Sequence, residues 1–423
     1  EYTVEVTDDN TQIQVESSTI TISEEEDDDA DFETNSITED RGDIAEITVT
    51  MDSTDFASIR FGSEDDGVEL NATVEDEDGD GQATVYLNTF QLTNGTANDE
   101  ALAVDSDSDD SVTDIEVTQN TSDLIDAGEY DLEVIAGEEN YGENSDAVAT
   151  FTLTERNTET LRMWTGSSTE INPQDLEDVN EAIANGEITQ SSDIAVGDLA
   201  VHQLVASGLE GALDARENED VTGPFLTDLQ GNDTQLTIEE ADPGANQDAR
   251  ELKLGTDNVS VIADGPNDTY FVIVDTEGPT NFDDGTSLPS DDDTELETNF
   301  TVIQDDLSRI GDFTDDDEFD DDENEETLVT FTAEEPEVTI NGPFNVSQAS
   351  GQTLSAQTNI APGTEVQLRV RSQDGVSPSF LKTSSPTVQP DGTFNATFDF
   401  SEQNIGDEYD IVVQSALLAD DEE

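Results

Sequence analysis

The stretch Asp126-Ala127-Gly128-Glu129-Tyr130-Asp131-Leu132 decides the fold of this chain. After Gly128, polar and apolar residues alternate as they do in a half-buried strand. The pattern returns near the other end of the chain, where Glu408-Tyr409-Asp410-Ile411-Val412-Val413 matches Glu129-Tyr130-Asp131-Leu132-Glu133-Val134 and Gly406 precedes the second copy. We therefore expect the same strand, with the same tyrosine, in two separate domains.

The position of the tyrosine indicates which kind of domain this is. In immunoglobulin-like sandwiches, a tyrosine near the start of strand F returns its hydroxyl to backbone a few residues upstream, and in antibodies a cysteine follows two residues later. Tyr130 fits that corner, and Leu132 stands in the place of the cysteine. The alternative is an ordinary strand with a surface tyrosine. The recurrence of the motif favours the corner.

Short apolar or alternating segments surround both copies, with acidic or glycine-rich turns between them. In the first part of the chain they are residues 13–22, 44–49, 68–74, 83–87, 130–134 and 148–153, and in the last part 338–340, 353–357, 365–370, 383–388, 393–400 and 409–413. Strands at this spacing predict β-sandwiches.

The middle of the chain has a different pattern. Asn172-Pro173 is suited to begin a helix, because proline is tolerated at the first helical position. Leu176, Val179 and Ile183 would share one face of that helix, and Gly186 would end it. Strands are expected over residues 236–238, 252–254, 259–262 and 270–274, while residues 199–206 suit either a buried strand or a helix.

These patterns predict a mainly β protein with tandem immunoglobulin-like β-sandwich domains and a mixed, mainly β middle domain. The expected domains are residues 1–155, residues 156–330 with a short helix and an acidic linker, and residues 331–423. Acidic runs at 24–31, 105–110, 291–293 and 315–326 are typical of solvated loops or linkers. We expect the last of them to separate the middle and C-terminal domains.

The charge balance indicates the solvent in which the protein folds. The chain has 423 residues, of which 107 are Asp or Glu and 11 are Lys or Arg, so its formal net charge is -96. Such self-repulsion opposes compaction in dilute buffer, and low hydrophobicity with high charge usually predicts disorder. Concentrated salt removes the conflict, because the Debye length falls to about 3 Å at 1 M. The sequence therefore predicts a protein of an extreme halophile.

Composition also excludes classes of partner and chemistry. An acidic chain cannot neutralise phosphates, so we expect no nucleic acid and no anionic lipid partner. There is no cysteine, hence no disulfide and no thiolate chemistry. No apolar stretch approaches the roughly 20 residues that span a bilayer. The chain begins at Glu1-Tyr2-Thr3, without Met, which we interpret as a mature N-terminus or a cloned boundary of an exported protein.

Catalytic candidates are few. His202 is the only histidine and lies in an apolar segment, where a structural role is more common than a Ser-His-Asp triad. Pairs of carboxylates, as used in glycoside hydrolysis, are inevitable among 107 acidic residues and carry no information. We therefore expect no enzymatic activity, no catalytic residue and no cofactor-binding residue.

Calcium is the one metal that the sequence suggests. Asp76-Glu77-Asp78-Gly79-Asp80-Gly81 resembles the first half of a calcium loop, with hard oxygen ligands around a turn that glycine allows. Asp76, Asp78 and Asp80 are the candidate ligands, but Leu87 occupies the place of the bidentate glutamate. The alternative is an acidic hairpin turn.

Three further patterns stand out in the sequence. Arg41-Gly42-Asp43 spells an adhesion tripeptide, which we interpret as coincidence in so acidic a chain, and Trp164 is expected to be a packing anchor. Asn-x-Ser/Thr glycosylation acceptors stand at Asn71, Asn94, Asn120, Asn232, Asn258, Asn267, Asn299, Asn345 and Asn395. In an exported chain we expect at least one of them to carry a glycan.

Several segments resemble the haloarchaeal surface glycoproteins, which are exported proteins of the cell envelope. The resemblance lies in Leu161-Arg162-Met163-Trp164-Thr165-Gly166, in Val196-Gly197-Asp198-Leu199 with His202-Gln203 and Ala206-Ser207-Gly208-Leu209-Glu210-Gly211, and in Ala361-Pro362-Gly363-Thr364 with Arg369-Val370-Arg371, Phe380-Leu381-Lys382-Thr383, Asp391-Gly392-Thr393-Phe394 and Phe398-Asp399-Phe400-Ser401. It covers the middle and C-terminal thirds and the Ala127-Gly128-Glu129-Tyr130 strand of the first third. It implies an extracellular, cell-surface location.

The function expected from these observations is that of a structural protein of a halophile's surface, which associates with itself in an S-layer-like lattice or an extracellular filament. The alternatives are an adhesin or glycan-binding module, and a spike protein of a halophile virus. Tyr2, Val4 and Val6 alternate onto one face of an N-terminal strand. That strand either pairs within the first domain or is donated to the open sheet edge of a neighbouring copy.

Overall fold

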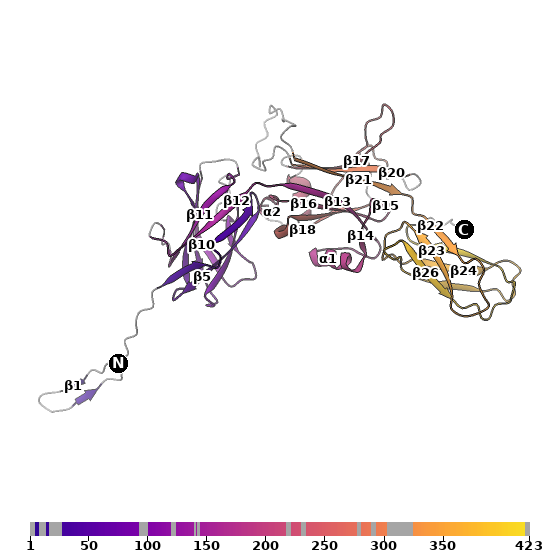
Figure 1. The fold of residues 1–423 in the computed structure, drawn as a ribbon, viewed down its shortest axis with the longest axis horizontal. Helices are drawn as coiled ribbons and strands as arrows, with labels where there is room; N and C mark the ends of the chain where they lie inside the picture. The colour runs from indigo at the N-terminus through magenta and orange to yellow at the C-terminus, as the bar shows by residue number, and fades with distance from the viewer. Residues whose placement is uncertain are drawn as a thin grey trace.

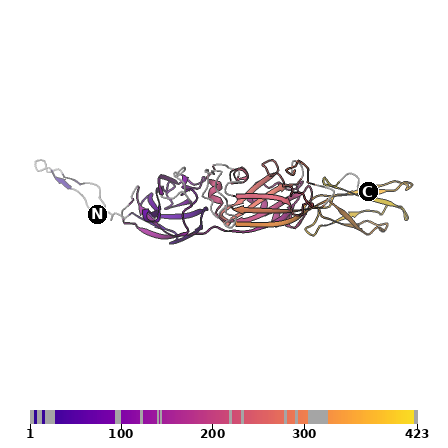
Figure 2. The ribbon, with the colours of Figure 1, turned by 90° about the horizontal axis from the view of Figure 1, so that it is seen from above.

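The computed structural model describes residues 5–7, 14–16, 28–92, 100–119, 124–138, 141, 144–216, 221–229, 234–276, 281–288, 293–302 and 325–418. Three β bodies follow one another in chain order along an elongated molecule (Figures 1 and 2). Each has its own buried apolar cluster. We refer to them as the first, middle and third domains. The mainly β fold predicted from the sequence is confirmed.

The first domain is a sandwich of two sheets. One sheet has the order β3-β5-β8-β9, made of β3 (Asp29–Phe32), β5 (Ile44–Asp52), β8 (Gln82–Asn88) and β9 (Leu102–Val104). The other has the order β10-β7-β6-β11-β12-β4, made of β10 (Ser111–Gln119), β7 (Val68–Glu75), β6 (Phe56–Ser63), β11 (Gly128–Ala136), β12 (Ala147–Thr154) and β4 (Ser36–Asp40). A short 3-10 turn, η1 (Glu64–Asp66), joins β6 to β7.

The predicted tyrosine corner lies in this domain. The Tyr130 hydroxyl donates to the carbonyl oxygen of Asp126 at 2.6 Å, which confirms the prediction. Its ring stacks on Phe61 at 5.2 Å between centroids, and Phe61 meets Phe151 edge-on. The second copy of the motif differs, because the Tyr409 hydroxyl reaches the carbonyl of Phe344 instead of backbone a few residues upstream.

The middle domain also has two sheets. The five-stranded sheet has the order β14-β13-β16-β19-β18, with β14 (Ile188–Gln190), β13 (Thr158–Gly166), β16 (Leu199–Ala206), β19 (Thr269–Asp275) and β18 (Val259–Asp264). The four-stranded sheet has the order β15-β21-β20-β17, with β15 (Asp193–Ala195), β21 (Glu325–Glu334), β20 (Thr294–Val302) and β17 (Thr234–Glu240). Between these strands lie three short helical turns, α2 (Glu210–Asp214), η3 (Pro224–Leu229) and η4 (Gly265–Asn267).

The predicted helix is α1 (Leu176–Asn185), and its start differs from the prediction. Asp175, not Asn172, caps it, because the Asp175 carboxylate accepts the backbone N–H of Asp178. Gly186 ends it with φ +74°, as predicted. Its buried face packs on the five-stranded sheet.

One sequence interpretation was wrong. We expected residues 315–326 to separate the middle and C-terminal domains. The strands on either side of that run, β20 and β21, pair antiparallel with each other. Thr294 lies opposite Ala333 at one end of the pair, and Val302 lies opposite Glu325 at the other. The acidic run therefore connects two strands of one sheet, and the middle domain's last strand continues to Glu334. The sequence did not reveal this, because both linkers and hairpin loops tolerate charge runs.

The third domain packs two three-stranded sheets face to face. They have the orders β22-β23-β26, from β22 (Val338–Gly342), β23 (Gln352–Thr358) and β26 (Thr393–Phe398), and β25-β24-β27, from β25 (Leu381–Ser384), β24 (Gln367–Ser372) and β27 (Tyr409–Gln414).

At the other end of the chain, β1 (Glu5–Thr7) pairs with β2 (Gln14–Glu16) in a two-stranded sheet that Figure 1 shows apart from the first domain. Within the described part of the chain, no helix is long and apolar enough to cross a membrane.

Candidate functional site: the two joints between domains

The joint between the first and middle domains is built around Asp43. Asp43 lies immediately before β5, in the turn that follows β4, and only 2% of it is exposed. Its carboxylate oxygens accept the backbone N–H groups of Gly208 at 2.5 Å and Glu210 at 3.1 Å, both from the middle domain. The Arg41-Gly42-Asp43 tripeptide is thus part of a domain interface rather than an exposed adhesion loop.

Further hydrogen bonds cross the same joint. The N–H of Gly211 donates to the carbonyl of Gly42 at 2.9 Å. The Asn88 amide nitrogen donates to the carbonyl of Gly211 and to the Asp214 carboxylate, each at 3.0 Å. Buried polar groups that lose such partners pay their full desolvation cost, so these bonds hold the two domains in one orientation.

The glycines of this joint allow the two backbones to touch. A Cβ on Gly42 would lie 2.6 Å from the Gly208 carbonyl oxygen, and a Cβ on Gly211 would lie 2.5 Å from the Gly42 carbonyl oxygen. Real Cβ atoms are not found at such distances. The positions therefore require glycine for close approach.

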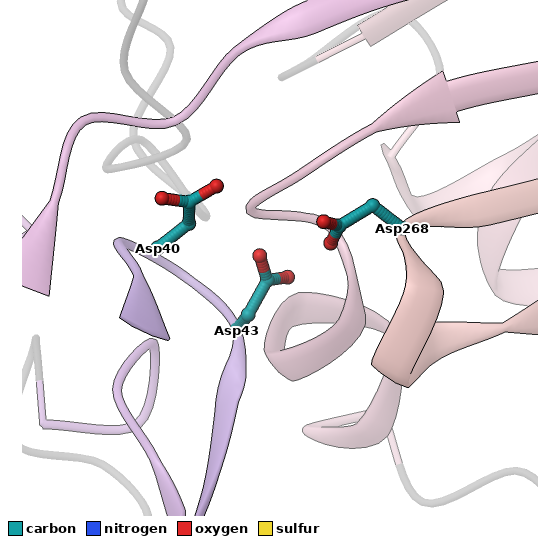
Figure 3. A group of neighbouring side chains, drawn as sticks. All are labelled: Asp40, Asp43 and Asp268. Atoms are coloured by element: carbon teal, nitrogen blue, oxygen red, sulfur yellow. The ribbon is translucent and has the colours of Figure 1, made fainter. Parts of the chain in front are cut away.

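Three carboxylates meet at the edge of this joint (Figure 3). Asp40 and Asp43 come from the first domain and Asp268 from the turn before β19, and one oxygen of each lies within 4.8 Å of the others. Burial raises the pKa of Asp43 to about 8 and that of the neighbouring Glu210 to about 7. The carboxyl groups of Asp43 and Glu210 are therefore costly to ionise without a counter-charge.

The joint between the middle and third domains has a similar plan, built around Asp198. This residue is fully buried, and its carboxylate accepts the N–H of Ala361 of the third domain at 2.7 Å. The Thr364 hydroxyl donates to the Ser167 hydroxyl at 2.8 Å across the same interface. A Cβ on Gly197 would lie 2.5 Å from the side chain of Leu417.

We predict that Asp198 makes stability depend on pH. Burial raises its pKa to about 7, so the folded state retains a proton that the unfolded chain releases near pH 4. The free energy of unfolding is therefore highest below about pH 4, and it falls as the pH rises through about 7. Asp198→Asn should flatten this dependence, by an amount on the order of 3 kcal/mol between pH 4 and pH 8. Thermal unfolding of both proteins in concentrated KCl measures the difference, and parallel pH profiles would contradict the prediction.

His202 has the structural role that the sequence indicated. It is fully buried between the two sheets of the middle domain, where its Nε2 hydrogen-bonds the Thr298 hydroxyl at 2.9 Å. Its ring meets Phe331 edge-on. Burial lowers its pKa to about 4, so it is neutral at ordinary pH. Trp164 is half-buried in β13 and donates to the Gln203 side chain at 3.2 Å.

The predicted calcium loop brings its three carboxylates together. One oxygen each of Asp76, Asp78 and Asp80 lies within 4.8 Å of the others. Asp76 is buried and accepts the N–H groups of Gly79 and Gly81, each at 2.7 Å. The loop is not a hairpin turn, because β7 and β8 belong to different sheets. Calcium binding here stays a prediction.

The glycosylation acceptors differ in exposure. Asn267, Asn345 and Asn395 are exposed. Asn71 and Asn299 are half-buried, and the Asn258 side chain is buried and donates to the carbonyl of Lys253 at 3.0 Å. Asn94, Asn120 and Asn232 lie outside the described residues. Glycan attachment stays a prediction, and among the six acceptors that the structure describes the three exposed asparagines are the best presented.

A groove of about 430 Å³ lies at the loops of the third domain. Phe344 and Ile405 on its wall are 66% and 90% exposed, which is unusual for apolar side chains of their size.

Comparisons with known proteins agree with the motifs. The chain is 39% identical over 97% of its length to a cell surface glycoprotein of Haloferax gibbonsii, and 33% identical over 97% of its length to cell surface glycoprotein 2 of Haloarcula hispanica. It spans about half the length of these curated relatives, 46% in each case. A family model described as "Domain of unknown function (DUF7827)" matches residues 22–137.

Among solved structures, a marsupial T cell receptor is 11% identical, with 92% of this chain and 99% of that chain covered. Its TM-score of 0.18 is too low to support any inference.

The motifs that carried the resemblance include the segments that form the joints. Gly208-Leu209-Glu210-Gly211 meets the first domain, while Gly197-Asp198 meets Ala361-Pro362-Gly363-Thr364. Over nearly its whole length, the chain is thus a homologue of haloarchaeal cell surface glycoproteins, and that homology places it outside the cell, at the cell surface.

Proposed function

We propose that this chain is a non-enzymatic structural protein of the cell surface, which serves as a stiff multidomain unit of an S-layer-like lattice or an extracellular filament. The observation that carries the proposal is the construction of the two joints. Domains within one chain usually move relative to each other. Here, reorientation would strip backbone partners from the buried Asp43 and Asp198. A rigid unit is what a repeating assembly requires, since every copy must present the same surfaces.

Self-association through the N-terminal strand remains part of this proposal. β1 pairs with β2, and neither strand belongs to a sheet of the first domain. An isolated two-stranded sheet is at best marginally stable in water, so a neighbouring sheet edge would stabilise it. Deleting residues 1–16 should then abolish assembly while the three domains stay folded. Arrays that form normally without these residues would refute strand donation.

The groove of the third domain favours a second candidate, a binding module. Exposed Phe344 and Ile405 beside polar Gln and Asn side chains suit a carbohydrate or a protein loop. The binding module would be favoured over the structural protein if the chain is a soluble monomer that binds a cell-surface glycan, and if Phe344→Ala abolishes that binding.

Electron microscopy of the source cell surface tests the structural proposal. A tagged copy of the chain should lie at regular spacing in arrays or filaments of the envelope. A copy whose first joint is broken by Gly211→Ala should enter these assemblies poorly, whereas Gly223→Ala, a change in open space, should enter them normally. A tagged chain scattered at random over the envelope would contradict a structural role.

We expect calcium to stabilise the first domain through the predicted loop. Asp76→Asn, Asp78→Asn and Asp80→Asn together remove charged oxygen ligands, which hard cations prefer, without much change of shape. The rise in melting temperature on adding CaCl₂ should become smaller in the triple variant. An equal rise in both proteins would show that this loop is not a calcium site.

A further inference from the structure

One sheet face of the third domain carries two arginines that form no described ion pair. Arg369 and Arg371 stand two residues apart on β24 and share its outer face, because side chains alternate along a strand. Arg369 donates to the neutral side-chain oxygen of Gln414 at 2.9 Å. Asp410 lies opposite Arg371, but its carboxylate accepts the Gln373 amide at 2.6 Å. In the described part of the chain, the ion pairs all involve other arginines, so both guanidinium charges on this face are uncompensated.

An exposed leucine lies beside these arginines. Leu381 of β25 is the cross-strand neighbour of Arg371, and 55% of it is exposed. Arginine is enriched in protein interfaces, whereas aspartate and glutamate are depleted there. We call Arg369, Arg371 and Leu381 the basic face. Its composition is that of an interface, in a chain whose surface is otherwise acidic.

The first domain carries a face of opposite charge and comparable layout. Glu129 and Asp131 stand two residues apart on β11, and both are exposed. Val148 of β12 lies on the same side of the sheet and is 51% exposed. On each face, two like charges are thus about 7 Å apart along a strand, with an exposed aliphatic side chain on the next strand. We call Glu129, Asp131 and Val148 the acidic face.

These two faces cannot meet within one chain. The first and third domains lie at opposite ends of the elongated molecule, with the middle domain between them (Figures 1 and 2). The buried hydrogen bonds of Asp43 and Asp198 hold both joints in one orientation. A contact between the basic face and an acidic face of this kind therefore requires a second copy.

Concentrated salt makes such a contact selective. The Debye length of about 3 Å at 1 M is close to the length of an ion pair, so salt suppresses the long-range repulsion between two acidic chains but not a pair in direct contact. Guanidinium binds carboxylate through two parallel hydrogen bonds. Water excluded by the aliphatic side chains lowers the local dielectric and strengthens these bonds. The faces that match at short range then decide how two copies meet.

We propose that the basic face of the third domain binds the acidic face of the first domain of a second copy of this chain. The contact joins unlike faces, so it is head-to-tail, and it propagates along the assembly unless its rotation closes a ring. This inference rests on the proposed function, because it names the faces through which the structural unit associates. It does not involve the N-terminal strand.

Reciprocal charge reversal tests the contact by sedimentation of the full chain in concentrated KCl. Arg369→Glu with Arg371→Glu makes both faces acidic, and Glu129→Arg with Asp131→Arg makes both faces basic. Either variant alone should associate with a dissociation constant raised at least about tenfold, because like charges then meet. An equimolar mixture should associate as the wild type does, because the acidic faces of one variant meet the basic faces of the other.

The matched control is Arg162→Glu with Lys253→Glu, which makes the same change of charge at exposed residues of the middle domain and should associate as the wild type does. A monomeric wild type, a reversal without effect, or a mixture that does not recover would overturn the contact. The proposed function is judged separately, by the position of the tagged chain in the envelope. Arrays that form normally from either reversal variant alone would refute the contact and leave the structural role standing.

Cross-linking tests the same contact without a change of charge. The chain has no cysteine, so Leu381→Cys in one copy and Val148→Cys in another supply the only thiols of a mixture. A short bis-maleimide should join these two variants to each other. Leu328→Cys, at a position that is 52% exposed on β21 of the middle domain, should not be joined to Val148→Cys. Equal yields from both mixtures, or no product from the first, would show that the two faces do not meet.

Discussion

Lowering KCl from about 3 M to about 0.1 M should remove most of the β-sheet circular dichroism of this chain, because the Debye length rises from below 3 Å to about 10 Å. The net charge is -96, and the ion pairs of Arg41, Arg60, Arg156 and Arg250 each compensate only one carboxylate. Unscreened repulsion over the domain surfaces then exceeds a folding free energy that is typically only 5–15 kcal/mol.

The three domains should not unfold together. Residues 335–418 carry ten acidic and three basic residues, so the third domain is far less acidic than the rest of the chain. Hydrogen exchange of the full chain at decreasing salt should show loss of protection first in the first and middle domains and last in the third. The fluorescence of Trp164, the single tryptophan, reports on the middle domain alone.

Sucrose provides the control for this experiment. It strengthens burial by exclusion from the protein surface, but it does not screen charge. KCl should therefore restore the fold where sucrose does not. Equal recovery in both, or an unchanged spectrum in low salt, would contradict the role assigned to screening.

Gly211→Ala should open the joint between the first and middle domains. In an isolated helix, alanine is about 1 kcal/mol better than glycine, and Gly211 lies in α2. In the folded chain, however, the new Cβ would collide with the Gly42 carbonyl oxygen and the Asn88 side chain. Overpacking against backbone costs about 1–3 kcal/mol, and loss of the buried bonds adds to it.

Small-angle scattering and hydrogen exchange measure this effect. We expect a more variable shape and faster exchange at the amides of Gly208, Glu210 and Gly211. Gly223→Ala is the matched control, because its Cβ would meet nothing within 4 Å. The prediction fails if both variants give the scattering and the stability of the wild type.

The sequence was most informative where a single element carries the signal. The tyrosine corner at Tyr130 depends on neighbours four residues apart, and the alternation of apolar residues gives each strand its buried face. The isolation of His202 in an apolar segment likewise indicated a structural histidine. Motif matches to surface glycoproteins predicted the relationship that the comparisons confirm.

The candidate site could not be found in this way. Asp268 is separated from Asp40 and Asp43 by more than half of the chain, and nothing in its local sequence distinguishes it from the other acidic residues. Arg41-Gly42-Asp43 looks like a coincidence in the sequence alone, since a tripeptide does not show whether another domain will cover it. The run at residues 315–326 suggests a linker between domains, because charge patterns do not show which strands pair.

Composition and periodicity by themselves determined the solvent, the β class and the absence of cysteine chemistry, because these depend on residue types and on the spacing of neighbours. Only the tertiary structure decided which acidic residues are buried at the joints and which remain on the surface. The physical reason is that burial of Asp43 and Asp198 is set by backbone groups of other domains, and contacts between distant segments leave no periodic trace in the sequence.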